Sequence, residues 1–244
     1  MTAPLDLGKV IAGAFLVPWW RRKAFARALA IPVALMVALS AVFYYYAITQ
    51  VPWYAALMTN VLYGLFFTLF AVTCHRLVLL DPESVAREPR LRWTRRETRF
   101  FLWVVAGWLV ILALMLPLLT VVLGVWATAS GSPGDGPEWV YGVAQLPLLY
   151  LLGRLCILFP ATAVDRDPPA DLRWAWRLTS GNGWRLLVIV GLLPWLLSWL
   201  VHFVHRSDAT PLEWLLVSLL AMTLFAVEIA AVSISYRELT KKAG

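Results

Sequence analysis

Residues 154–190 read RLCILFPATAVDRDPPADLRWAWRLTSGNGWRLLVIV, and this stretch decides how the chain is organised. It begins as the end of an apolar run, which the acidic and proline-rich segment Asp165–Pro169 interrupts. A short segment rich in Trp and Arg follows, and Ser180–Gly183 predicts a turn because two of its four residues are glycine. Trp184 and Arg185 then open a second apolar run. The pattern predicts two membrane-spanning helices joined at the membrane surface by an amphipathic segment.

The composition of the whole chain agrees with a membrane protein. Hydrophobic residues make up 61% of its 244 positions and charged residues 14%, whereas soluble domains average about 45–50% and about 25%. The hydrophobic residues form discrete runs of the roughly 20 residues that a membrane-spanning helix needs. We therefore predict an all-α integral membrane protein with six transmembrane helices, at about 24–48, 53–80, 99–127, 139–159, 184–204 and 211–236.

The basic residues indicate the orientation of these spans. In a six-span topology, 20 of the 21 Lys and Arg residues lie on one side of the membrane, and only Arg206 lies on the other. Basic residues near transmembrane helices concentrate on the cytoplasmic side, so both termini are predicted to be cytoplasmic. The same distribution accounts for the net charge of +7 without a nucleic-acid partner.

The six predicted spans pair into three hairpins, each preceded by an amphipathic helix on the cytoplasmic face. Two of these helices are expected within 4–20 and 82–98, and the third is the Trp- and Arg-rich segment before Ser180. The Leu91-Arg92-Trp93 sequence matches Leu172-Arg173-Trp174 in its place before a span. These similarities between segments predict a pseudo-threefold repeat of units 1–80, 81–160 and 161–244 within one membrane domain, 1–244. The alternative is that the basic loops of any six-span protein show similarities of this kind.

One acidic residue, Glu228, lies deep in a predicted span. It precedes Arg237 by nine residues, which places it about 13 Å from that end of the helix. A lone charge is unfavourable there, so Glu228 is expected to be protonated or paired. Arg154 is the first candidate partner and Arg76 the second. A pair of this kind serves either as a proton or ion relay or as a salt bridge that fixes helix packing.

The remaining candidate site residues are arginines that could contact anionic lipid headgroups. They flank the predicted spans on the cytoplasmic side, where polybasic segments attract such lipids, and they are Arg92, Arg95, Arg96, Arg173, Arg177 and Arg185. No catalytic residue, cofactor or metal site is predicted. The three histidines, His75, His202 and His205, read as interfacial, and the two cysteines, Cys74 and Cys156, as buried apolar side chains without a disulfide.

The stretch from Arg154 to Leu187 also resembles a motif of a bacterial family of six-span proteins. These are the membrane domain attached to some glycerophosphoryl diester phosphodiesterases and the related YciC-like inner-membrane proteins. The closing AVSISYREL, at residues 231–239, is similar to the ending of that family. Ala175 departs from the family, which often has Ser there. The resemblance implies the six-span fold and the bacterial inner membrane, but not phosphodiesterase chemistry, which belongs to a separate soluble barrel.

Together these observations predict a non-enzymatic protein of the bacterial inner membrane. The first functional hypothesis is lipid binding, or an accessory or scaffold role, at the cytoplasmic leaflet, with membrane lipids as partners. The alternative is a small-molecule or ion transporter that uses Glu228 with Arg154.

Overall fold

The computed structural model describes residues 4–48, 52–89, 91–130, 138–166, 170–204 and 210–243. Every regular element in these residues is a helix. The main helices of the predicted spans are α2 (Arg22–Ile48), α3 (Trp53–Leu79), α5 (Arg95–Ser130), α6 (Glu138–Leu155), α10 (Leu193–Val204) and α11 (Pro211–Ala243). The others are α1 (Leu7–Trp20), α4 (Pro82–Arg87), α7 (Leu158–Ala163), α8 (Leu172–Leu178), α9 (Gly183–Leu187) and the π-helix η1 (Val188–Leu192).

Six helical segments of the described residues are long and apolar enough to cross a membrane. They are Arg22–Phe43, Trp53–Leu79, Arg95–Val125, Gln145–Ala163, Gly183–Val201 and Pro211–Lys242. The prediction of an all-helical chain with six apolar spans is therefore confirmed. The segments in α2, α3, α5 and α11 fall within a few residues of the predicted bounds, whereas the other two combine shorter helices.

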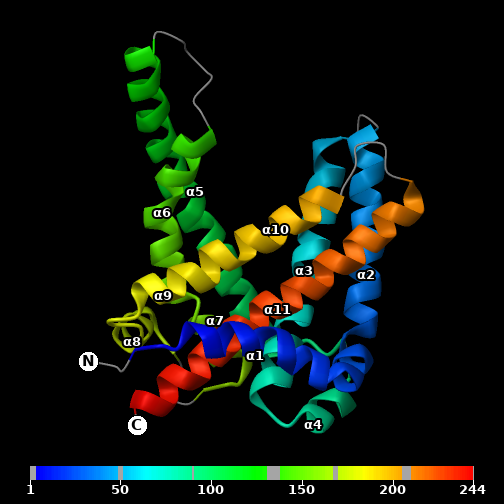
Figure 1. Cartoon of the computed structure of the whole chain (residues 1–244). Coiled ribbons are helices and arrows are strands. Elements are labelled where there is room, and N and C mark those ends of the chain that lie inside the picture. Colours follow the sequence, from blue (N-terminus) through cyan, green and yellow to red (C-terminus); the bar gives the residue numbers. More distant parts are fainter. Residues whose placement is uncertain are drawn as a thin grey trace.

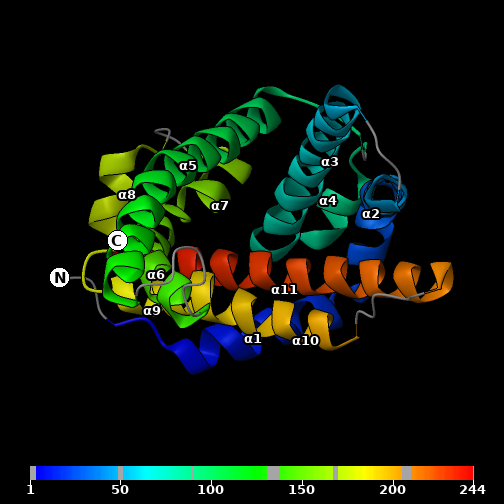
Figure 2. The ribbon, with the colours of Figure 1, turned by 90° about the horizontal axis from the view of Figure 1, so that it is seen from above.

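The long helices pack in pairs that rise from a common base (Figure 1). Helix α2 packs along α3, α5 along α6, and α10 along α11. Helices α1, α4, α7 and α8 gather at the base, together with the end of α11 (Figure 1). The α5/α6 and α2/α3 pairs diverge away from this base (Figure 1), and α11 runs beside α10 (Figure 2). Most of the candidate arginines therefore belong to the base.

Local capping explains where several helices begin. Asp6 caps α1, since its side chain accepts from the Lys9 N–H at 3.1 Å, and Asp81 caps α4 by accepting from the Ser84 N–H at 2.9 Å. Pro82 occupies the first turn of α4, where its missing N–H loses no hydrogen bond. Glu97 accepts from the Thr94 N–H at 2.8 Å at the start of α5. This last contact is one half of a capping box.

Two of the prolines inside the apolar spans lie near helix starts. The fourth span was predicted to end at 159, but α6 ends at Leu155 and the span continues to Ala163, with Pro160 in the first turn of α7, a position that tolerates proline. The fifth predicted span, 184–204, corresponds to Gly183–Val201, within which α9, η1 and α10 follow one another directly. Pro194 is the second residue of α10, just after the π-helical turn. Proline cannot donate to the preceding turn, and a local π-helix accommodates that loss.

The predicted amphipathic helix at 82–98 is also shorter than expected. Only α4, six residues long, is helical before α5 begins at Arg95. Glu88 adopts an extended conformation, as residues before a proline usually do, because a following proline ring disfavours the helical region. The predicted amphipathic segment is therefore divided by Pro89 into a short helix and an extended approach to α5.

Helix α1 lies against the last part of α11 at the base (Figures 1 and 2). Its Val10 and Ala14 are completely buried, whereas Trp19 and Trp20 are 66% and 71% exposed. Polar contacts attach the same segment: the Lys9 ammonium pairs with Glu238 at 3.2 Å, and Lys242 donates to the Pro4 carbonyl at 2.7 Å. The two ends of the described chain are thus held together.

The buried core is concentrated where α1, α2, α3 and α11 meet. Helix α5, by contrast, has no buried residue in the most apolar 18-residue window of its span. Large side chains such as Leu102, Trp108 and Leu116 are more than half exposed. Apolar surface on this scale is stable in lipid, because a bilayer removes it from water.

Candidate functional site

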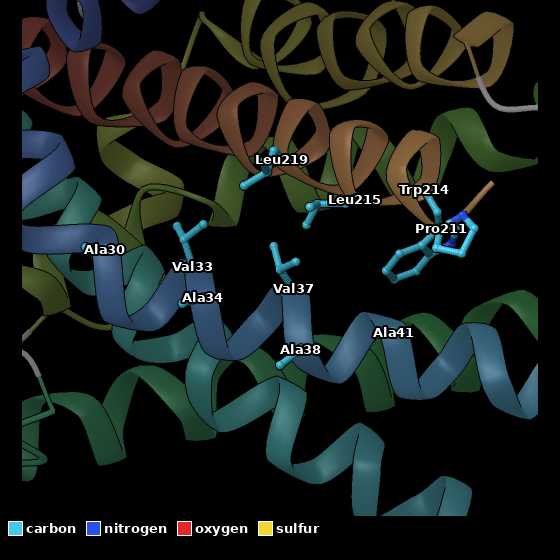
Figure 3. Close-up of a pocket in the computed structure, with 10 residues that line it drawn as sticks. All are labelled: Ala30, Val33, Ala34, Val37, Ala38, Ala41, Pro211, Trp214, Leu215 and Leu219. Carbon is cyan, nitrogen blue, oxygen red and sulfur yellow. The ribbon is translucent and has the colours of Figure 1, made fainter. Parts of the chain in front are cut away.

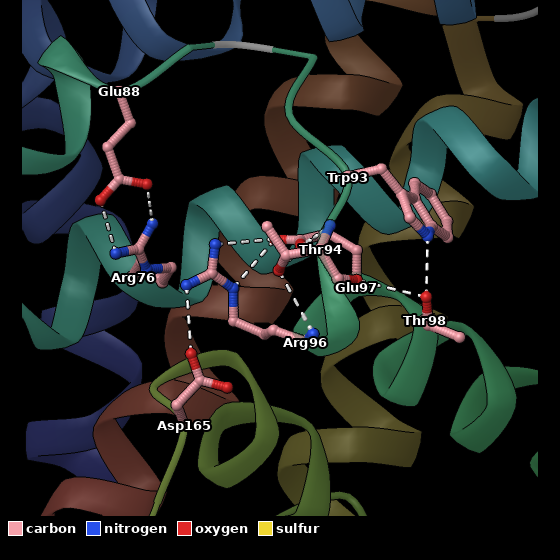
Figure 4. A network of polar contacts seen from close by, with 8 residues as sticks. All are labelled: Arg76, Glu88, Trp93, Thr94, Arg96, Glu97, Thr98 and Asp165. Carbon is pink, nitrogen blue, oxygen red and sulfur yellow. Dashed lines mark hydrogen bonds and ion pairs between the residues drawn. The ribbon is translucent and has the colours of Figure 1, made fainter.

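The candidate arginines at the base differ in what they contact. Some form ion pairs or hydrogen bonds inside the protein, and others make no such contact with the described residues. Figure 4 shows the internal contacts around Arg76 and Arg96.

Arg76, near the end of α3, forms a two-pronged ion pair with Glu88 beyond α4. Its two terminal nitrogens donate to the two carboxylate oxygens at 2.5 and 2.7 Å (Figure 4). Hydrogen bonds from Arg76 are the main reason why the pKa of Glu88 is lowered below its ordinary value. The pair holds the segment after α4 against the end of α3.

Arg96, at the start of α5, forms a second set of ion pairs. Its guanidinium contacts the Glu97 carboxylate at 2.8 Å and Asp165, in the turn after α7, at 3.3 Å (Figure 4). Thr94 also hydrogen-bonds to Glu97. Arg96 was predicted to contact lipid. In the structure its guanidinium instead joins the start of α5 to the turn that follows α7.

Arg154 is attached to α8 and does not form the predicted pair with Glu228. Its guanidinium lies 3.5 Å from the centre of the Trp176 ring, and its Nε donates to the Thr179 hydroxyl at 3.1 Å. The same guanidinium donates to the Trp176 carbonyl. The prediction was wrong because Arg154 ends α6 at the base, where the α8 segment folds back onto it.

Glu228 remains without an ion pair or hydrogen bond among the described residues. It is half-buried on α11 and lines a cavity of about 140 Å³ between α10 and α11, together with Ser198, Leu197 and Phe225. The second candidate partner, Arg76, is engaged by Glu88. The described structure therefore supplies no arginine to neutralise Glu228.

Arg173 and Arg177 lie four residues apart on α8, a spacing that places them on the same face. Both are exposed, and neither makes an ion pair or hydrogen bond with the described residues. With Leu151 and Leu155 of α6 and with Leu172 and Trp176 of α8, they line a cavity of about 600 Å³. Two guanidinium groups thus lie beside the apolar side chains of one cavity.

The other predicted lipid contacts are distributed around the base. Arg92 and Arg95 are exposed and Arg185 is half-buried, and none has an ion pair in the part of the chain described. Arg92 also lines a small polar cavity of about 30 Å³ with Arg76, Glu88 and Glu97, room for about one water molecule.

Asn182 is a structural contact that sequence reasoning did not identify. It is only 1% exposed, and its side-chain oxygen accepts from the Leu5 N–H at 2.7 Å. Asn182 thereby attaches the segment before α1 to the predicted turn. Gly181 in that turn has φ of +79°, a conformation that glycine adopts without strain.

His75, which was predicted to be interfacial, lies near the end of α3. The side chain is buried, its Nδ1 lies 2.7 Å from the Ser233 hydroxyl, and its ring lies 5.8 Å from that of Phe100. It thus joins α3 to α11. The side chains of His202 and His205 lie outside the described residues. Among the described residues, no group of three or more His, Cys, Asp or Glu side chains is arranged to hold a metal ion.

Comparison with models of protein families, with curated proteins and with solved structures found no match.

Proposed function

We propose that this chain is a non-enzymatic, multi-pass protein of the bacterial inner membrane. It binds anionic phospholipids of the cytoplasmic leaflet through the Lys and Arg residues at its base. Lipid binding positions the base against the membrane surface, where it serves as an accessory or scaffold for a partner. The six apolar spans support the membrane location, and the resemblance of residues 154–187 to YciC-like proteins supports the bacterial inner membrane.

The cavity between α6 and α8 carries this proposal. A phospholipid needs cations for its phosphate and an apolar surface for its acyl chains, and both are present there. Arg173 and Arg177 provide unpaired guanidinium groups, and Leu151 and Leu155 provide the apolar wall. Arginine binds phosphate well because its planar group offers several donors at once.

The distribution of charge supports cytoplasmic termini. Twenty of the 21 Lys and Arg residues belong to the sequence segments that a six-span topology places on one side of the membrane, and basic residues mark that side as cytoplasmic. We further propose that the three helix pairs with α1, α4 and α8 are three related units, 1–80, 81–160 and 161–244. The placement of a short helix before each pair supports that repeat.

Native mass spectrometry of the purified chain tests the lipid proposal. We expect it to retain phosphatidylglycerol in preference to phosphatidylcholine. The double variant Arg173→Gln/Arg177→Gln is expected to weaken that preference by about fivefold for each arginine, since a cation near an anionic surface contributes about 1 kcal/mol. Arg87→Gln/Lys241→Gln removes the same charge from exposed positions outside this cavity and is the control. Equal retention of both lipids by the parent protein would refute the proposal.

A second candidate function is transport that uses Glu228. The observation that favours it is the carboxyl group without a described partner, which lines the cavity between α10 and α11 beside Ser198. Intramembrane acidic residues often belong to proton or ion pathways. Glu228→Gln is expected to abolish flux in a proteoliposome assay of pH-driven uptake, and Ser198→Ala to leave most of it. Unchanged flux in Glu228→Gln would remove this candidate.

A further inference from the structure

A lateral groove separates α2 from α11 on the opposite side of α11 from the Glu228 cavity, and Figure 3 shows its outer part. It consists of two adjoining cavities of about 600 and 670 Å³, which share Ala30, Val33 and Leu219. The first cavity begins at Arg22 and Trp19 at the base, and the second extends to Ala41 of α2 and Trp214 of α11. The two volumes together form one continuous groove.

The end of the groove at the base has the length of one lipid chain. From Arg22 to Ala34 it follows α2 for about 18 Å at 1.5 Å per residue, comparable with one leaflet, which is half of the roughly 30 Å hydrocarbon layer. Buried Phe70 and Met222 form part of its floor, and the Ser40 hydroxyl contacts that of Ser218 at 3.5 Å beside it. Ala30, Ala34 and Ala38 are exposed along the groove, so it opens sideways to the bilayer.

Its charge is confined to the end at the base. The Arg22 guanidinium lies 5.4 Å from the centre of the Trp19 ring and donates to the Trp19 carbonyl at 3.4 Å. Arg22 has no ion pair in the described residues, and no Asp or Glu lines either cavity. A cation beside an aromatic ring at the membrane surface, followed by an apolar channel, is complementary to an anionic headgroup with its acyl chain.

We infer that this groove holds one anionic phospholipid of the leaflet at the base. The phosphate lies at Arg22 and Trp19, and an acyl chain follows Ala30 and Val33 toward Ala34. The site consists of elements other than α6 and α8, so it is independent of Arg173 and Arg177. It rests on the proposed function only for the identity of the leaflet.

Photocrosslinking of the full chain tests the site. The protein is reconstituted in phosphatidylcholine vesicles with a small fraction of phosphatidylglycerol that carries a diazirine in one acyl chain, and the crosslinked peptides are identified by mass spectrometry. Crosslinks are expected on α2 and α11 around Ala34 and Leu219. Ala34→Trp fills the groove and should remove most of them. Ala113→Trp, on the exposed face of α5, is the matched control and should retain them.

A second pair of variants tests the headgroup contact without altering the shape of the groove. Arg22→Gln is expected to lower crosslinking on α2 and α11 by about fivefold. This factor corresponds to the roughly 1 kcal/mol that one cation contributes near an anionic membrane surface. Lys23→Gln removes the neighbouring exposed charge, which does not line the groove, and should leave the yield unchanged. Equal crosslinking by a phosphatidylcholine probe would overturn the selectivity for an anionic lipid.

Other results separate this inference from the proposed function. Loss of the α6/α8 lipid in Arg173→Gln/Arg177→Gln with intact α2/α11 crosslinks would support an independent groove site. Unchanged crosslinks in both Ala34→Trp and Arg22→Gln would overturn the groove site even if the α8 site binds lipid. If Ala34→Trp instead dissociates a dimer of the parent protein while its lipid crosslinks persist, the groove is an interface between two copies and the inference is wrong.

Discussion

The arginine side chains at the base serve two purposes that residue type alone does not distinguish. Arg76, Arg96 and Arg154 hold chain segments together through ion pairs, hydrogen bonds and a contact with an aromatic ring. Arg173 and Arg177 make no ion pair in the described structure and remain available to an anion. The first group therefore governs stability, and the second is expected to govern binding.

Replacement of Glu88 tests the structural role of Arg76. In Glu88→Gln the partly buried Arg76 loses its charged partner, and we expect destabilisation by about 1 kcal/mol, reduced from the usual value for a charged hydrogen bond because Glu88 is partly exposed. The apparent melting temperature in detergent should fall accordingly. Glu83→Gln, which loses an exposed pair with Arg27, is the control and should change it little. Equal effects of the two variants would contradict this role of Arg76.

The same ion pair predicts a pH dependence. Because Arg76 lowers the pKa of Glu88 in the folded protein, the unfolded chain binds its proton more readily. The pair therefore contributes its full stability above the unfolded pKa of about 4.3 and loses it as the pH falls through the lower folded pKa. The difference in melting temperature between the parent and Glu88→Gln should be constant near pH 7 and shrink toward pH 3. A difference that grows on acidification would refute this assignment.

Among the elements, the contact between α6 and α9 is one of the tightest described. A Cβ atom placed on Gly153 of α6 would lie 3.1 Å from the backbone carbon of Leu186 in α9. Backbone atoms cannot rotate out of the way as a flexible side chain can. This close approach allows the chain to turn back through α8 and begin the fifth span directly beside α6.

Gly153→Ala is therefore expected to destabilise the protein by about 1–3 kcal/mol, the usual effect of overpacking. Gly107→Ala on α5 is the matched control, because nothing lies within 4 Å of its added Cβ. In that variant the better helix propensity of alanine should leave stability unchanged or raise it by up to about 1 kcal/mol. Thermal unfolding in detergent measures both, and a neutral Gly153→Ala would show that α6 and α9 can move apart.

Helix composition and caps could be predicted from sequence because they depend on neighbouring residues. The Asp81 cap, the Asp6 cap and the apolar spans are of this kind. The partner of Arg154 could not be predicted, because it depends on how α8 packs on α6. Spacing along a helix places Glu228 at a depth but does not reveal which helix it faces. The Trp and Arg residues of 173–177 were the one local signal that could have suggested a partner on α8.

On the scale of the whole molecule, the orientation is open to a direct test. Cys74 and Cys156 are buried, so an introduced cysteine can be labelled selectively. A membrane-impermeant maleimide on intact cells should label Trp53→Cys, at the exposed start of α3 away from the base. Arg92→Cys, at the base, should be labelled only after permeabilisation. Labelling of Arg92→Cys in intact cells would reverse the orientation and move the proposed lipid contacts to the other leaflet.

The docking of α1 on α11 has a consequence for biosynthesis. Helix α1 leaves the ribosome before α11, yet Glu238 and the apolar surface that receives α1 belong to α11. Docking of α1 is therefore possible only after α11 has been synthesised. A nascent chain that stops before α11 leaves α1 without the helix on which it packs.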